Sequence, residues 1–147
     1  MLTDIEESFM AADERWFQGR LVELDETECW ELVRSREVGR VAYIDGLGAM
    51  VVPITYISDE ESVLFRVAPY SQLAWHLPDT HAALEVDDID YFTRSGWSVV
   101  LRGPVKKVES DELPAPEDRP TPWPAGQRGL YLRLTPRAVT GRRLLEA

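Results

Sequence analysis

One short segment, FRVAPYSQL at residues 65–73, combines residue types that can bind an anion. Arg66 lies between two apolar residues of a predicted strand, and the chain then passes a proline into a predicted helix that starts at Ser71 and Gln72. A guanidinium beside the free N–H groups and the hydroxyl of a helix start is suited to phosphate. The segment therefore predicts an anion site. The alternative is an ion pair of Arg66 with Glu85, a carboxylate that requires a partner inside an otherwise apolar strand.

The other residue types that catalyse reactions show no familiar spacing. The sequence contains no GxSxG, HExxH or CxxC pattern, and a proline between His76 and His81 breaks any helical face that they could share. Cys29, the only cysteine, belongs to an apolar stripe and is predicted to be a small core residue. Asp87 is expected in a solvated turn. We therefore expect no metal site, and no catalytic side chain is assigned.

The composition is typical of one globular domain with an acidic surface. The 147 residues are 44% hydrophobic and carry a net charge of -10, which would repel a phosphate backbone, so general nucleic-acid binding is not expected. The longest apolar runs are far below the roughly 18 residues that a membrane helix needs. Since the acidic N-terminus also differs from a signal peptide, we expect a cytoplasmic protein that makes no membrane contact.

Charge is unevenly distributed along the chain. Residues 1–37 contain eleven acids and four bases, whereas residues 128–147 contain one acid and five arginines. These C-terminal arginines either face an anionic ligand or neutralise the acidic N-terminal helices across the fold or across a subunit contact.

Two helices are predicted before the first long strand. Apolar residues recur at helical spacing near the N-terminus, which predicts a helical extension over residues 1–20, ahead of the main domain at residues 21–147. A second helix is predicted over residues 26–36, because Asp25 can cap it and Glu28 occupies the capping-box position.

From residue 38 onward the apolar periodicity changes to two, which is typical of strands with one buried face. A short helix is expected at residues 71–76, and residues 113–126, with five of the ten prolines, are predicted as a loop. Gly103 and Pro104 are expected to bend the longest strand at a barrel corner. The pattern predicts a mainly β fold, a six-stranded antiparallel barrel with flanking short helices. The strands are expected at residues 38–45, 49–57, 62–67, 82–86, 97–109 and 129–139.

Four segments, in this order, resemble the pyridoxamine 5'-phosphate oxidase-like flavoproteins, particularly their short actinobacterial-type members: ELDETECWELVRSREVGRVAYIDG, VVPITYISDEESVLFRVAPYSQL, LEVDDIDYFTRSGWSVVLRGPVKKVES and PWPAGQRGLYLRLTPRAVTGRR. The resemblance extends over residues 21–143. It implies a split β-barrel of the FMN-binding type and a homodimer. It also implies one FMN, or in some branches the deazaflavin F420, in each of two clefts between the subunits.

The resemblance assigns the phosphate end of the cofactor to the FRVAPYSQL segment. Arg66 matches the strand arginine that holds the flavin phosphate in this family, and Ser71 and Gln72 occupy the place of a small residue followed by lysine. Gln72 in place of lysine, and Val67 in place of threonine or serine, each remove a hydrogen bond to the phosphate. A hydrogen bond to a charged group is worth about 1.5 to 3 kcal/mol, so FMN affinity is expected to be reduced.

Two further segments match strands that lie near the flavin ring in the family. Residues 51–56 match the strand whose backbone lies beside the isoalloxazine, and residues 95–99 match a segment that the partner subunit brings to the cleft. For Trp97 the alternative is packing in the core or at the dimer contact. The candidates from these segments are Val52, Pro53, Ile54, Trp97 and Ser98.

The activity implied by the resemblance is that of a flavin-dependent oxidoreductase with a small-molecule substrate. The flavin carries the hydride, and the protein supplies orientation and electrostatics. One alternative is an F420-binding reductase. Another is a degenerate, non-catalytic split-barrel dimer that has lost flavin binding, which the glutamine at position 72 favours.

Overall fold

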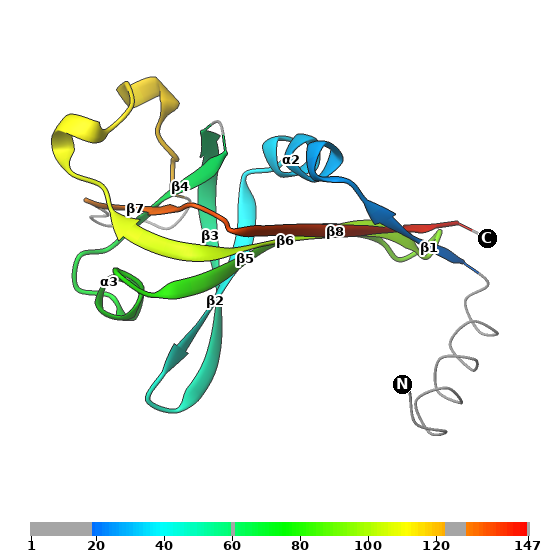
Figure 1. The fold of residues 1–147 in the computed structure, drawn as a ribbon, viewed down its shortest axis with the longest axis horizontal. Helices are drawn as coiled ribbons and strands as arrows, with labels where there is room; N and C mark the ends of the chain where they lie inside the picture. Colours follow the sequence, from blue (N-terminus) through cyan, green and yellow to red (C-terminus); the bar gives the residue numbers. More distant parts are fainter. Residues whose placement is uncertain (1–18, 60, 123–128, 147) are drawn as a thin grey trace.

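A computed structural model describes residues 19–59, 61–122 and 129–146 of the chain (Figure 1). The helix expected in the N-terminal extension lies outside the described residues. The described strands are β1 (Arg20–Leu24), β2 (Val38–Asp45), β3 (Gly48–Asp59), β4 (Ser62–Val67), β5 (His81–Asp90), β6 (Ser95–Lys107), β7 (Leu130–Leu134) and β8 (Ala138–Leu145). The helices are α2 (Glu26–Arg34) and α3 (Gln72–His76), with single turns of 3-10 helix at η1 (Ser110–Glu112) and η2 (Pro116–Asp118).

Six of the strands close into an antiparallel barrel. The order is β6, β5, β2, β3, β4 and β7, and β7 pairs again with β6. β8 pairs with the other edge of β6, and β1 pairs with β8, so these two strands extend the sheet outside the barrel (Figure 1). The six-stranded antiparallel split barrel predicted from the sequence is therefore confirmed.

Strand β6 changes partners along its length, and this allows the sheet to close. Residues 96–102 pair with β8, whereas residues 105–107 pair with β7. Between them lies Gly103, where an added Cβ would stand 2.3 Å from the Thr135 carbonyl oxygen, so only glycine fits this close backbone approach. The bend expected at Gly103 and Pro104 is confirmed.

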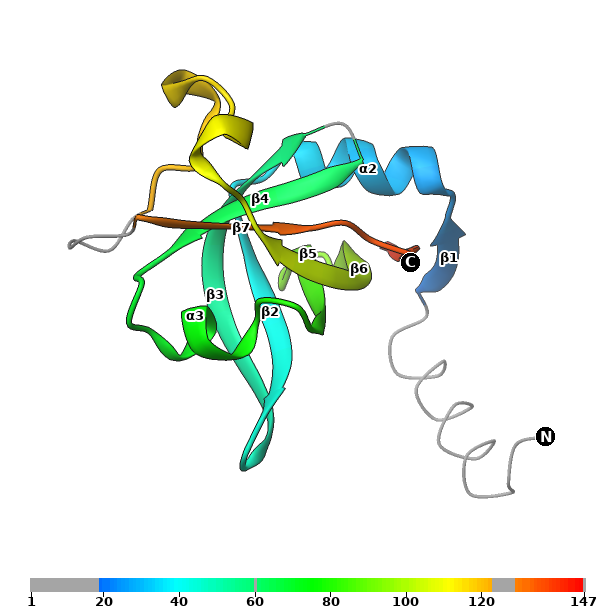
Figure 2. The same cartoon turned by 60° about the vertical axis from the view of Figure 1, so that its left-hand side comes forward.

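One hydrophobic core fills the barrel and extends to α2, which lies on the opposite side of the molecule from α3 (Figure 2). The helix starts at the predicted cap, where the Asp25 carboxylate accepts a hydrogen bond from the Glu28 N–H at 2.8 Å. Cys29 and Val33 of α2 are fully buried, which confirms Cys29 as a core residue. Burial and the nearby carboxylates raise the pKa of the Cys29 thiol, so this group is a poor nucleophile.

The structure corrects three details of the strand prediction. β1 was not predicted at all. Residues 129–139 were expected as one strand, but β7 ends at Leu134 and β8 begins at Ala138, with Pro136 between them. β5 continues to Asp90, so Asp87 is a strand residue and was wrongly expected in a turn.

The proline-rich loop and the two described α-helices agree with the sequence, although α2 ends two residues before the predicted end and α3 begins one residue after the predicted start. The loop expected at residues 113–126 contains only the single turn η2 over its described part, residues 113–122.

Within the described ranges no helix has the length and apolar character that a membrane span requires.

Candidate functional site

Arg66 lies near the end of β4, where this strand separates from β3. The pairing of the two strands ends at Tyr56 and Phe65, immediately before Arg66. Arg66 is half-buried, and its guanidinium carbon is 4.9 Å from the centroid of the Tyr131 ring. The side chain of the next residue, Val67, is buried in the barrel core. The strand therefore presents a positive charge on its outer face, and the Val67 side chain faces away from any ligand there.

Helix α3 starts a few residues beyond Arg66. The Ser71 hydroxyl caps this helix, since it donates a hydrogen bond to the Ala68 carbonyl at 2.7 Å and accepts one from a first-turn N–H at 3.2 Å. The exposed Gln72 side chain has its Oε1 atom 3.2 Å from Nε2 of His76. The hydroxyl proton of Ser71 is thus already used, so it can reach a phosphate only by giving up the bond to Ala68.

Residues 52–54 of β3 lie beyond the stretch of β3 that pairs with β4. They pair instead with β2, where Pro53 stands opposite Arg40. Ile54 is buried in the core and Val52 packs against it, whereas Pro53 is exposed on the outer face. A ligand beside this strand would meet Pro53 and the backbone, and the side chains of Val52 and Ile54 would lie beneath it.

Trp97 and Ser98 lie in another part of the subunit, at the start of β6 (Figure 1). Trp97 is buried in the core, with the guanidinium carbon of Arg36 5.4 Å from its ring centroid. Ten residues of β6, roughly 30 Å of strand, separate Trp97 from Lys107, which pairs with β7 next to the level of Arg66. A single subunit does not bring Trp97 and Ser98 to Arg66.

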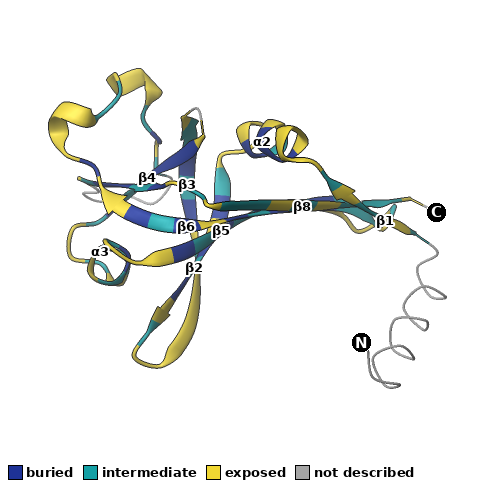
Figure 3. Cartoon of the chain, in the orientation of Figure 1, coloured by how far each residue is buried: buried dark blue, intermediate teal, exposed yellow. Residues whose placement is uncertain are grey.

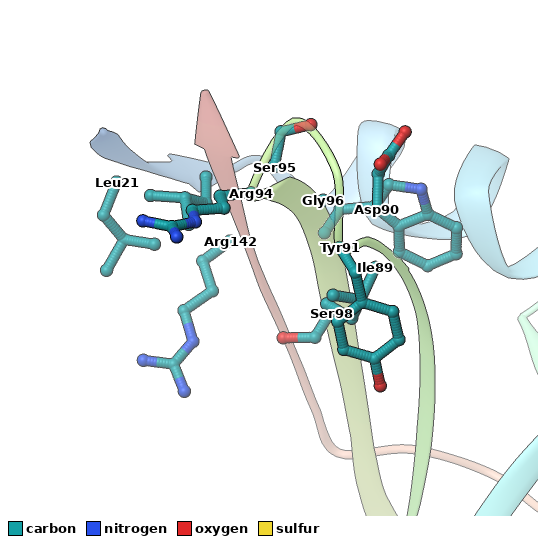
Figure 4. A pocket seen from close by; sticks show the side chains of 11 residues that line it. Leu21, Ile89, Asp90, Tyr91, Arg94, Ser95, Gly96, Ser98 and Arg142 are labelled. Carbon is teal, nitrogen blue, oxygen red and sulfur yellow. The ribbon is translucent and has the colours of Figure 1, made fainter. Parts of the chain in front are cut away.

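Ser98 borders an open cleft of about 820 Å³ between the β5–β6 hairpin, β8 and β1. Figure 4 shows Leu21, Arg94 and Arg142 on one side of this cleft, and Ile89 and Tyr91 on the other. The cleft therefore combines apolar walls with two guanidinium groups. No local pattern in the sequence indicates this cleft, because its walls come from residues far apart in the chain.

A charged cluster on the outer face of β2 and β5 was also missed. Nη1 of Arg40 lies 3.0 Å from the Glu85 carboxylate and 3.1 Å from that of Asp87. The partner that Glu85 requires is therefore Arg40. Partial burial and the adjacent Asp87 raise the pKa of Glu85 to about 7, against the lowering effect of Arg40. Since Arg40 stands opposite both Glu85 and Pro53, this cluster places a carboxyl group with a raised pKa across β2 from residues 52–54.

A second arginine, Arg119, reaches the Tyr131 ring from the proline-rich loop. The guanidinium carbon of Arg119 is 5.8 Å from the centroid of the Tyr131 ring, and its Nε donates a hydrogen bond to the Pro114 carbonyl at 2.9 Å. The Tyr131 ring thus contacts two guanidinium groups, from Arg66 and Arg119. No spacing in the sequence indicated this contact, because it depends on how the loop returns to β7.

These features define a class of protein, the antiparallel split barrels that carry an arginine at the end of a barrel strand. The profile of the pyridoxamine 5'-phosphate oxidase family matches residues 25–143, and the chain belongs to this family.

Individual relatives agree with this assignment. The protein Rv0080 of Mycobacterium tuberculosis, which is described as uncharacterized, is 28% identical over 131 residues, covering 85% of this chain and 86% of the relative. A structure named as the FAD binding protein from Mycobacterium smegmatis is 27% identical with a TM-score of 0.67, covering 84% of this chain and 98% of that one. An FAD-binding protein from Mesorhizobium loti, at 21% identity, shares the fold with a TM-score of 0.69, over 87% of this chain and 99% of the other.

Proposed function

We propose that this chain is a flavin-dependent oxidoreductase that acts on a small-molecule substrate in the cytoplasm. The observation that carries the proposal is the position of Arg66, which lies where β3 and β4 separate, six residues before the start of α3, with its guanidinium over the Tyr131 ring. A guanidinium binds phosphate with two parallel hydrogen bonds, so this place suits the phosphate of a flavin nucleotide. The solved relatives named as FAD-binding proteins support a flavin as the ligand.

The proposed hydrogen-bond donors fit a nucleotide phosphate, and one of these donors is charged. Arg66 supplies the positive charge, Gln72 supplies only a neutral amide, and the Ser71 hydroxyl is engaged in the helix cap. We therefore expect Arg66 to provide most of the phosphate affinity, and the overall affinity to be modest. We propose FMN as the cofactor, because one phosphate is the group that this donor set can hold.

The remaining candidates would act on the ring end of the cofactor. When bound, the flavin supplies the two-electron transfer. Pro53 and the backbone of β3 would pack beside the ring and exclude water from one side of it. Glu85, which shares Arg40 with the same surface, would hold or release a proton at its carboxyl near neutral pH.

We propose that the working unit is a homodimer. Arg66 and the pair Trp97 and Ser98 lie far apart in one subunit, so a second copy is needed to unite them in one site. Several large apolar side chains also remain exposed on the protruding β2–β3 hairpin (Figure 3), including Ile44 at 71% and Leu47 at 100% exposure. A stable dimer of this kind would bury roughly 2,000 Å² and cover such side chains.

A flavin-free, non-catalytic dimer is the second candidate function. Three observations favour it: the glutamine at position 72, the buried Val67 side chain and the engaged hydroxyl of Ser71. Each of them removes a donor that a tightly bound phosphate would use.

The spectrum of the purified protein separates these candidates. We expect the visible bands of an oxidised flavin, either as purified or after incubation with FMN, and mass spectrometry of the released cofactor to distinguish FMN, FAD and F420. A protein that takes up none of the three would support the flavin-free dimer. Light scattering tests the assembly, and a particle of 16.8 kDa would contradict the dimer and the composite site with it.

A further inference from the structure

We propose that the cleft between the β5–β6 hairpin, β8 and β1 binds the substrate, and that this substrate is a small apolar molecule with one carboxylate. The inference rests on the proposed function, because it names the substrate class of the site that a second copy would complete. Arg142 of β8 and Ser98 of β6 form a polar pair that holds the carboxylate, and the apolar walls of the cleft hold the rest of the molecule.

The two residues of the polar pair stand next to each other on one face of the sheet. Arg142 and Ser98 are directly opposite in the pairing of β8 with β6, where two Cβ atoms lie about 4.5 to 5.5 Å apart. Both line the cleft, and Figure 4 shows the Ser98 hydroxyl pointing to the side on which the Arg142 guanidinium lies. The side chain of Trp97 is buried in the core, since successive side chains of a strand alternate between its faces. Ser98 therefore presents its side chain to a ligand in the cleft, and Trp97 does not.

The donors of the polar pair are unused. In the part of the chain that the structure describes, no hydrogen bond or ion pair engages the Ser98 hydroxyl or the Arg142 guanidinium. Glu23 stands opposite Arg142 on β1 but forms no ion pair with it, and Asp87, opposite Ser98 on β5, is bound to Arg40 at 3.1 Å. A guanidinium beside a hydroxyl can donate to both oxygens of one carboxylate.

The next row of residues across the sheet is apolar. Ile89, Gly96 and Leu144 are in register across β5, β6 and β8, and Leu21 of β1 continues the row. Because Gly96 has no side chain, the floor of the cleft is open between Ile89 and Leu144. Tyr91, which is 90% exposed, adds an aromatic wall (Figure 4). This row lies two residues, about 7 Å, from the polar pair, so one small molecule can contact both.

The charges in the cleft favour one carboxylate. The acidic residue of the lining, Asp90, accepts hydrogen bonds from the backbone N–H groups of Phe92 and Thr93 at 2.9 and 3.1 Å, and Arg94 adds a second guanidinium to the lining. The net charge of -10 repels anions at long range, so the affinity must come from contacts inside the cleft. One guanidinium and one hydroxyl match the two oxygens of a carboxylate, whereas a phosphate dianion would require further donors.

The place of the cleft in the proposed dimer makes its ligand a substrate. Ser98 is a residue that one copy is proposed to bring to the Arg66 site of the other. A molecule held by Ser98 would then lie beside the flavin of the other copy. The volume of about 820 Å³ leaves room for such a molecule in the cleft.

Calorimetry with cinnamate and its neutral amide, cinnamamide, tests the polar pair in the protein without flavin. The two probes have nearly the same shape and differ in charge. We expect the wild type to bind cinnamate at least about fivefold more tightly than cinnamamide, and Arg142→Gln to bind both equally.

Arg143→Gln is the matched control, because it removes the same charge from the next residue of β8, whose side chain lies on the other face of the sheet. The control should keep the wild-type preference for cinnamate. Equal affinities of the wild type for the two probes, binding of neither, or loss of the preference in Arg143→Gln would overturn the proposal.

A substitution in the apolar row tests the other half of the site. Ile89 is 51% exposed, so Ile89→Gln should keep the wild-type melting temperature. We expect this variant to bind both probes about three- to tenfold more weakly and to keep the preference for cinnamate, since it removes apolar contact and no charge. Unchanged affinity for both probes would show that the ligand does not use this wall, which contradicts the proposal.

The role as substrate is tested on the FMN-loaded protein. Cinnamate bound beside the flavin ring should shift the visible bands of FMN in the wild type, and the same concentration should cause no shift in Arg142→Gln. A protein that takes up no flavin would contradict the proposed function and the role as substrate with it, while the calorimetry still decides the carboxylate site. If FMN is bound and cinnamate binds without changing its spectrum, the cleft is not the substrate site and the proposal is wrong.

Discussion

Replacing Gln72 with lysine would show whether the start of α3 faces a bound phosphate. Gln72 is exposed, and its Oε1 atom lies 3.2 Å from Nε2 of His76. Little packing is therefore lost in Gln72→Lys, while an ammonium group is added beside a site that otherwise depends on Arg66. In the proposed arrangement the variant should bind FMN more tightly than the wild type.

The size of the gain follows from the exposure of this position. Two unit charges 4 Å apart interact by about 1 kcal/mol in water and by about 4 kcal/mol near a protein surface. A solvent-exposed lysine stays near the lower limit, and physiological salt screens it further. Because a phosphate carries nearly two negative charges, part of the attraction weakened by solvent and salt is restored. We expect a gain of about 1 to 2 kcal/mol, which is a five- to thirty-fold lower dissociation constant.

Quenching of FMN fluorescence measures both affinities in one titration format. The experiment compares wild type and Gln72→Lys at low and high salt, with Ala115→Lys as a control that adds the same charge on an exposed loop. The gain should appear only at position 72 and should shrink as salt is added. Equal affinities of wild type and Gln72→Lys, or an equal gain in the control, would refute the placement of a phosphate at this helix.

Two further predictions concern the barrel itself. Because the pKa of Glu85 rises to about 7 from an ordinary 4.5, the unfolded state loses its proton first, so the free energy of unfolding should fall between pH 4.5 and 7. The fall should be about 1 to 2 kcal/mol, discounted for the partial exposure of the carboxylate. In Glu85→Gln the free energy of unfolding, measured by urea titration, should change less with pH over the same range. At Gly141 an added Cβ would stand 2.6 Å from the Sγ of Cys29, whereas nothing lies within 4 Å of Gly46. Gly141→Ala should therefore lower the free energy of unfolding by about 1 to 3 kcal/mol, and Gly46→Ala should change it by less than about 0.5 kcal/mol; equal effects would contradict the packing of α2 on β8.

The sequence predicted the elements whose signals are local. The cap of α2 at Asp25, the strands β2 and β4, and the start of α3 near Ser71 depend on residues within a few positions of each other. The bend at Gly103 is also local, since glycine followed by proline interrupts any strand. β1 could not be found in this way, because its five residues are stabilised by pairing with β8 at the other end of the chain.

The candidate site was predictable only where one segment contains all of its groups. Arg66, Ser71 and Gln72 are within seven residues, so the sequence alone can predict them as one group. The contact of Arg119 with Tyr131 and the pairing of Arg40 with Glu85 join distant segments. Which residue of β5 lies opposite Arg40 depends on the register of β2 with β5. Hydrophobic periodicity predicts which face of a strand is buried, but it does not identify the neighbouring strand.

The most direct test of the central claim is the FMN affinity of Arg66→Ala, measured by equilibrium titration beside the wild type. Arg137→Ala serves as the matched control, because it removes an exposed arginine elsewhere. We expect the Arg66 variant to bind FMN at least about tenfold more weakly, a loss of about 1.4 kcal/mol or more. Its melting temperature without flavin, and the affinity of the control, should stay at the wild-type values. Unchanged FMN affinity in Arg66→Ala would contradict the account, because the flavin phosphate would then be held elsewhere.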